Sequence, residues 1–208
     1  MPAPQTYRGT ITREQFLSRE VRAVARLMHS EHLEDASGIV ERVVKENLFQ
    51  YPTERDLASI ARACHRRIMS ATSDPALHSK VLELLAEGTT GQLDQANLYC
   101  MMCDNRLVWD FMVCVIGAKN QRFETGLTAG QIAAFIEGLR AQSADVDRWS
   151  DATRNKVRQV LTRCIVDCGM YNRKEGALTP FRADIELEDL IRANNDACVL
   201  PAFGILEQ

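Results

Sequence analysis

Residues 150–168 of the chain read SDATRNKVRQVLTRCIVDC, and this stretch decides the kind of fold. Apolar side chains recur along it at steps of three and four residues, the spacing of one face of an α-helix. Ser150 stands where a helix N-cap is expected, and Gly169 follows as a C-terminal stop. We therefore expect an amphipathic helix from about Asp151 to Cys168, with an apolar face made of Val157, Val160, Leu161, Cys164, Ile165 and Cys168.

The same helical spacing continues along most of the chain. It predicts helices over about residues 12–28, 36–47, 54–70, 75–87, 128–141 and 186–193, and two more within 92–116 that meet near Asp104. In 170–181, Lys174-Glu175-Gly176 separates two short extended stretches and predicts a β-hairpin. The fold class is an all-α, multi-helix bundle with a small β-hairpin. We expect an N-terminal helical domain at 1–125 and a C-terminal winged-helix-like region with an acidic tail at 126–208.

The charge of the chain is unevenly distributed. The 208 residues carry 25 basic and 28 acidic side chains, a formal net charge of −3, which excludes a protein that binds nucleic acid with its whole surface. Residues 148–182, however, hold eight basic and three acidic side chains, a balance of +5. Residues 183–208 have a balance of −5. A polyanion would therefore have to bind to one defined patch.

The outer face of the 151–168 helix suits a duplex. Amides and hydroxyls can read base edges, while arginine and lysine can hold phosphates. A helix, a turn, this second helix and a hairpin follow one another in the order of a winged helix-turn-helix. A solvated amphipathic helix is the alternative, because polar outer faces are common. The candidate DNA contacts are Arg154, Asn155, Lys156, Arg158, Gln159, Thr162, Arg163, Arg173 and Lys174.

Two further basic stripes are predicted on helices nearer the N-terminus. One consists of Arg19, Arg22, Arg26 and His29, and the other of Arg55, Ser59, Arg62 and Arg66. Such spacing suits phosphates, but the arginines can equally pair with carboxylates or lie on a solvated face. We add Arg19, Arg22, Arg26, Arg62 and Arg66 to the candidate DNA contacts.

Nothing in the sequence indicates an enzyme. Cys100-Met-Met-Cys103 and Cys164…Cys168 could in principle supply four thiolates to zinc. Both pairs fall on apolar helical faces, however, where cysteine packs as a small hydrophobe. P-loop, GxGxxG, GxSxG and HExxH motifs are missing. We expect no catalytic residue, metal, cofactor or small-molecule substrate.

The N-terminus MPAPQTYRGT shows no signal peptide, and no apolar run approaches the length of a membrane span. Seven cysteines without a secretory signal fit reduced thiols. We expect a cytoplasmic protein that makes no membrane contact.

Several short segments recur in a recognisable order and spacing. They are Tyr7-Arg-Gly-Thr-Ile-Thr12, Phe16-Leu17-Ser-Arg-Glu20, Val44-Lys-Glu-Asn47-Leu48-Phe49, Leu127-Thr128, Ile132-Ala-Ala-Phe135, Trp149-Ser150-Asp-Ala-Thr153-Arg154 and Cys168-Gly169-Met170. Together they resemble the BrxA family of BREX phage-defence systems, and the resemblance spans about residues 7–182. It implies a helical, non-enzymatic protein that is related in fold to the transcription antitermination factor NusB. It also implies that this protein binds double-stranded DNA and acts with other BREX-system proteins.

Two alternatives to duplex binding stay open. An RNA-binding, antitermination-like module would follow from the NusB-like relation, although the chain offers few aromatic side chains for base stacking. A protein-interaction subunit would use the arginine stripes against an acidic partner. The sequence does not decide among the three.

Overall fold

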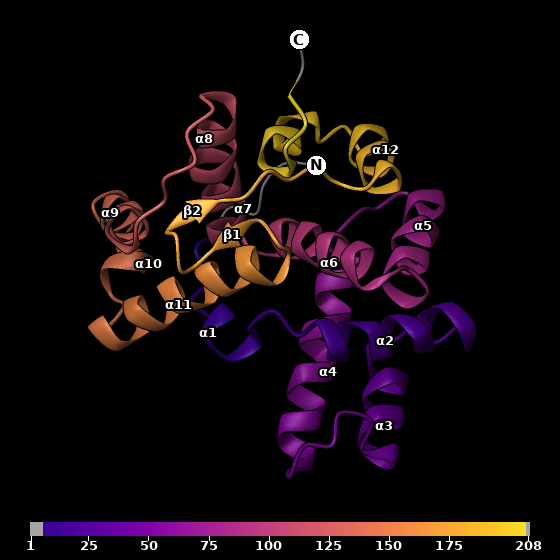
Figure 1. Ribbon diagram of the computed structural model, residues 1–208. Coiled ribbons are helices and arrows are strands. Elements are labelled where there is room, and N and C mark those ends of the chain that lie inside the picture. The colour runs from indigo at the N-terminus through magenta and orange to yellow at the C-terminus, as the bar shows by residue number, and fades with distance from the viewer. Residues whose placement is uncertain (1–5, 207–208) are drawn as a thin grey trace. The chain divides into compact units, whose positions relative to one another are not determined.

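The computed structural model describes residues 6–206, and these fall into two compact units. One unit is Leu17–Asp104, and the other combines the described residues before Leu17 with those from Asn105 onward. The domain boundary expected between residues 125 and 126 falls inside the second unit. Helices make up most of both units, which confirms the predicted helical class (Figure 1).

The Leu17–Asp104 unit contains five helices close to the predicted positions. Three begin at a side-chain cap: Asp35, Thr53 and Asp74 each accept a hydrogen bond from a backbone N–H of the first turn. Their apolar faces pack together into a core, with α3 against α4 and α2 against α5. The helices are α2 (Ser18–Ser30), α3 (Ala36–Glu46), α4 (Glu54–Met69), α5 (Pro75–Ala86) and α6 (Thr90–Asp104).

The continuous helix expected over residues 12–28 is wrong. The chain forms a single turn, α1 (Ile11–Glu14), and starts again at α2. Gln15 (φ 24°) and Leu17 (φ 57°) have positive φ angles, which a right-handed helix cannot accommodate. Between them, Phe16 is buried. The break therefore directs Phe16 into the core, and it coincides with the boundary between the two units.

The second unit holds the C-terminal half of the chain. The two helices predicted within 92–116 do meet at Asp104–Asn105, where Asn105 caps the second one. Three elements lie outside the predicted ranges: the short α8, the short α10 and a 3-10 segment near the C-terminus. Besides α1, the unit contains α7 (Arg106–Phe111), a π-helical turn (Met112–Gly117), α8 (Ala118–Gln121), α9 (Ala129–Arg140), α10 (Ala144–Asp147), α11 (Asp151–Asp167), β1 (Tyr171–Asn172), β2 (Ala177–Leu178), α12 (Ile185–Ala193) and the 3-10 segment Ala197–Phe203.

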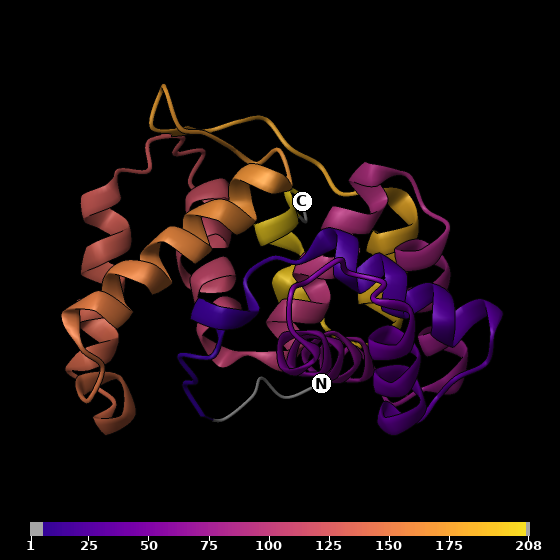
Figure 2. The ribbon, with the colours of Figure 1, turned by 90° about the horizontal axis from the view of Figure 1, so that it is seen from below.

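The predicted hairpin forms directly after α11. Its strands are antiparallel, with Tyr171 opposite Leu178 and Asn172 opposite Ala177. The backbone N–H of Leu127 donates to Gly176 O at 2.9 Å, and that of Leu178 donates to Thr125 O at 2.7 Å. The hairpin is thereby attached to the segment that precedes α9. Figure 2 shows α11 beside α9, with the hairpin turning back over α11 toward the segment that precedes α9.

Within residues 6–206, no helix is both long and apolar enough to cross a membrane.

Candidate nucleic-acid interface

Helix α11 is held in its unit by the apolar face that the sequence predicts. Val157, Val160, Leu161, Cys164 and Ile165 are all buried. The Ser150 hydroxyl accepts a hydrogen bond from the N–H of Thr153 at 3.2 Å and so caps the helix. The opposite face is therefore fixed toward solvent.

The solvent face of α11 carries most of the predicted contact residues. Asn155, Lys156, Gln159 and Arg163 are exposed, while Arg158 and Thr162 are half-buried. The Thr162 hydroxyl donates to the carbonyl of Arg158 at 2.9 Å, so its proton is used within the helix. At the hairpin tip, Arg173 and Lys174 are exposed.

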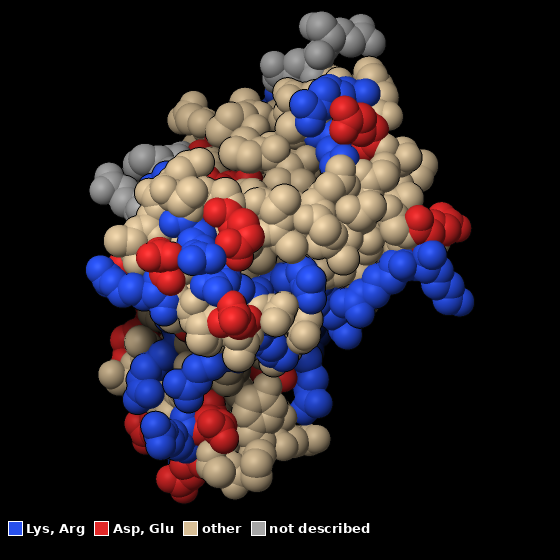
Figure 3. Space-filling model, turned by 90° about the vertical axis from the view of Figure 1, so that its left-hand side faces the viewer, with Lys and Arg blue, Asp and Glu red and all other residues tan. Residues whose placement is uncertain are grey.

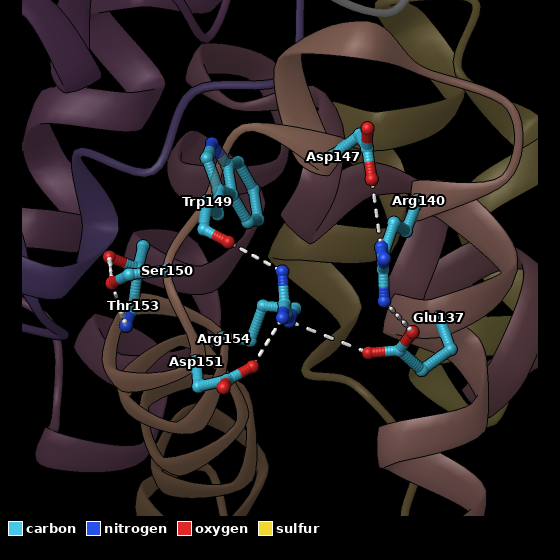
Figure 4. A network of polar contacts seen from close by, with 8 residues as sticks. All are labelled: Glu137, Arg140, Asp147, Trp149, Ser150, Asp151, Thr153 and Arg154. Carbon is cyan, nitrogen blue, oxygen red and sulfur yellow. Dashed lines mark hydrogen bonds and ion pairs between the residues drawn. The ribbon is translucent and has the colours of Figure 1, made fainter.

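Among the predicted contact residues on α11, Arg154 makes the most polar contacts within the protein. Its side chain is 17% exposed, and its guanidinium donates to the carbonyl of Trp149 and to the carboxylate of Asp151. Its Nε lies 3.5 Å from Glu137 Oε1 on α9. Figure 4 shows the guanidinium between these three partners. Arg154 therefore joins α11 to α9.

The same network continues along α9 and α10. Arg140 Nη1 lies 3.3 Å from the second oxygen of Glu137, and its Nε donates to Asp147 at 2.8 Å (Figure 4). The bond from Arg140 holds the pKa of Asp147 below its usual range. Glu137, Arg140 and Asp147 were not among the predicted site residues. The i, i+3 spacing of Glu137 and Arg140 was visible in the sequence, but the bridge from Glu137 to Arg154 needs the tertiary fold.

Ion pairs neutralise half of the basic side chains in residues 148–182. Arg148 pairs with Asp145 at 3.3 Å, Arg163 with Asp167 at 2.6 Å and Arg182 with Glu188 at 3.3 Å, in addition to Arg154. Figure 3 shows the result on one face of the molecule, where basic and acidic side chains are interspersed. In the described part of the chain, the other four make no ion pair: Lys156, Arg158, Arg173 and Lys174.

The stripe on α2 is used largely inside its own unit. Arg22 Nη2 donates to Gly88 O at 2.6 Å, just beyond the end of α5, and Arg26 Nε donates to Ala86 O at 3.2 Å, in the last turn of α5. Arg19 Nη2 donates to Phe49 O at 3.3 Å. These three arginines act as caps and braces of the helical unit.

The arginines of the α4 stripe differ in their surroundings: two are exposed to solvent and one is paired with a buried carboxylate. Arg55 and Arg62 are exposed. Arg66 forms a two-pronged contact with Asp104, with Nε and Nη2 each 3.0 Å from a carboxylate oxygen, and the Asp104 side chain is only 6% exposed. Both basic stripes belong to the Leu17–Asp104 unit, whereas α11 and the hairpin belong to the other.

The two cysteine pairs lie in different units, and three of the four side chains are buried. Burial raises the pKa of Cys100 to about 12, so its thiol stays protonated at neutral pH. Among residues 6–206, no three His, Cys, Asp or Glu side chains are grouped closely enough to hold a metal ion.

Comparison with known proteins places this helical architecture in a family. The model of the BrxA family matches residues 5–195. A BREX protein BrxA from Bacillus cereus (strain H3081.97) is 29% identical over 203 residues, covering 94% of this chain and 95% of the relative. The crystal structure of an uncharacterized protein from Magnetospirillum magneticum superposes with a TM-score of 0.76 at 19% identity, covering 96% of this chain and 98% of the other. At that identity the likeness shows the fold alone.

The class defined by these features is a small helical protein with a partly basic helix–hairpin surface. The chain belongs to the BrxA family. The resemblance seen in the sequence is thereby confirmed.

Proposed function

We propose that this chain is a non-catalytic DNA-binding component of a BREX-type phage-defence system. Membership of the BrxA family, together with a relative named as a BREX protein, supports the defence role and makes other BREX-system proteins its expected partners. In this proposal the chain binds duplex DNA, which it contacts through α11 and the hairpin that follows.

One observation carries the DNA-binding part of the proposal. Lys156 and Arg158 on α11, and Arg173 and Lys174 on the hairpin, have no acidic partner among the described residues. Unpaired cations are available to phosphates without first breaking an ion pair. Gln159 stands exposed beside them on α11 and can donate to or accept from base edges.

The order of elements also supports this surface. Helix α9, the short α10, α11 and the β1–β2 hairpin follow one another, and α9 packs against both α10 and α11. That order matches a winged helix-turn-helix, in which the second helix enters the major groove and the wing lies along the backbone. We extend the proposal to that geometry, and to a NusB-like arrangement of the helices.

Charge reversal at the unpaired cations tests the proposal. We expect the Lys156→Glu/Lys174→Glu double variant to weaken binding to any duplex sequence, and to reduce the slope of log affinity against log salt by about 2. Lys45→Glu/Lys80→Glu is the matched control, since both lysines are exposed and their reversal changes the net charge equally. If both double variants lose the same affinity, the surface is misassigned.

Competition assays distinguish this function from the two alternatives. Single-stranded RNA that displaces duplex DNA with higher affinity would favour an antitermination-like module. Co-purification with protein partners that survives nuclease treatment, without any DNA affinity, would favour an interaction subunit. Duplex DNA that competes best supports the proposal.

A further inference from the structure

Two carboxylates contact the guanidinium of Arg154, one of the candidate DNA contacts. Its Nη1 donates to Trp149 O and its Nη2 to Asp151, and its Nε lies 3.5 Å from Glu137 Oε1. The side chain of Asp151 is 89% exposed and that of Glu137 is 54% exposed, so solvent or a ligand can reach both carboxylates. Exposed ion pairs of this kind are weak and can be exchanged for another anion.

A groove lies beside this cluster, between α9 and α11. It has a volume of about 320 Å³ and is lined by Arg154, Arg158 and Asn155 from α11, with Glu137 and Ile136 from α9. In the described part of the chain, Arg158 has no acidic partner and Asn155 makes no side-chain hydrogen bond. Two guanidinium groups and an amide donor around one opening are a donor set that suits a phosphate.

Carboxylates outnumber guanidinium groups in this cluster of ion pairs. Its members Arg140 and Arg154 carry two positive charges, and Glu137, Asp147 and Asp151 carry three negative charges, a balance of −1. Within a distance of about 10 Å, charges of this kind act on one another at ordinary salt. Glu137 links the two arginines of the cluster, because one of its oxygens faces Arg140 and the other faces Arg154.

We propose that a backbone phosphate of DNA binds in this groove by replacing Glu137 and Asp151 at the guanidinium of Arg154. The two carboxylates then act as built-in competitors that lower the affinity of the chain for nucleic acid. Arg158 and Asn155 donate to the same phosphate. This inference rests on the proposed DNA-binding function. It adds one phosphate site and two carboxylates that lower the affinity for DNA.

Isosteric neutralisation of the competitors tests the inference with duplex DNA at low salt. We expect Glu137→Gln and Asp151→Asn each to raise the affinity about two- to five-fold, the range that corresponds to one exposed ion pair. Asp189→Asn on α12 is the matched control, because it removes one exposed negative charge of the same unit that makes no ion pair among the described residues. The gain from Glu137→Gln should disappear in an Arg154→Gln background, with thermal unfolding checked for every variant.

Each outcome has a defined meaning. A gain at Glu137 and Asp151 that exceeds the gain at Asp189 and requires Arg154 supports the inference. If wild-type protein binds DNA but Glu137→Gln behaves like Asp189→Asn, or if its gain persists without Arg154, the inference is overturned and the proposed function stands. If neither wild type nor any variant binds duplex DNA at low salt, both the function and the inference fail.

Discussion

The guanidinium of Arg22 on α2 donates to the carbonyl of Gly88, 2.6 Å away, just beyond the end of α5. Arg26, one helical turn later, reaches Ala86 O in the same way. Carbonyls in the last turn of a helix have no intrahelical partner, and a cation is the favourable group to place there. A row of arginines with the spacing of a phosphate-binding stripe thus serves the packing of two helices.

Removing this contact is expected to affect stability more than DNA binding. Arg22→Ala should lower the free energy of unfolding by about 1.5–3 kcal/mol, the usual contribution of a hydrogen bond to a charged group. Chemical denaturation measures the effect. Arg62→Ala on α4 is the control: its side chain is exposed, and the stability should change by less than about 0.5 kcal/mol. Equal denaturation midpoints for the two variants would show that Arg22 is not a structural cap.

Gly204 is expected to tolerate no side chain. Its φ is +72°, and a Cβ at this position would stand 1.8 Å from the carbonyl oxygen of Phe181. The Phe181 oxygen belongs to the backbone, so it cannot rotate away as the end of a side chain could. Gly204→Ala should therefore destabilise the fold by about 1–3 kcal/mol from backbone strain alone. In contrast, Gly138→Ala in α9 meets no atom within 4 Å and should stabilise by up to about 1 kcal/mol. Thermal unfolding of the two variants should therefore shift in opposite directions, and a shift in the same direction would contradict the close approach at Gly204.

Thiol reactivity tests the packing role of the cysteines. Cys114 and Cys198 are exposed, Cys103 is half-buried, and Cys64, Cys100, Cys164 and Cys168 are buried. At pH 8 we expect a thiol reagent to modify Cys114 and Cys198 first, more slowly than a free thiol because partial burial raises the pKa of both. Cys100, with its pKa raised to about 12, should react only after unfolding. Rapid labelling of Cys100 in the native protein, located by mass spectrometry, would contradict its burial.

Local signals predicted most of the helices, because the causes of helix ends are local. Asp74 before Pro75 starts α5, and Thr128 with Gln131 forms the reciprocal capping box that starts α9. The break at Gln15 and Leu17 had no such signal. Neither residue favours a positive φ, so the conformation is imposed by the tertiary fold around the buried Phe16.

The candidate surface was only partly predictable for a related reason. Counting charges by segment located the basic helix and hairpin, and the pairing of Arg163 with Asp167 follows an i, i+4 rule. The pairing of Arg154 with Glu137 joins two helices and is invisible without their packing. The predicted balance of +5 overstated the charge available to a ligand, because carboxylates outside residues 148–182 also pair with arginines of this segment: Glu137, Asp145 and Glu188.

The salt dependence of duplex binding tests the central claim most directly. If Lys156, Arg158, Arg173 and Lys174 supply the phosphate contacts, a plot of log affinity against log salt for the wild-type protein should fall with a slope of about −3 to −4. The affinity should then drop about 100-fold between 50 and 200 mM salt. No measurable binding at 50 mM salt, or binding that does not change with salt, would contradict the assignment of this surface to DNA.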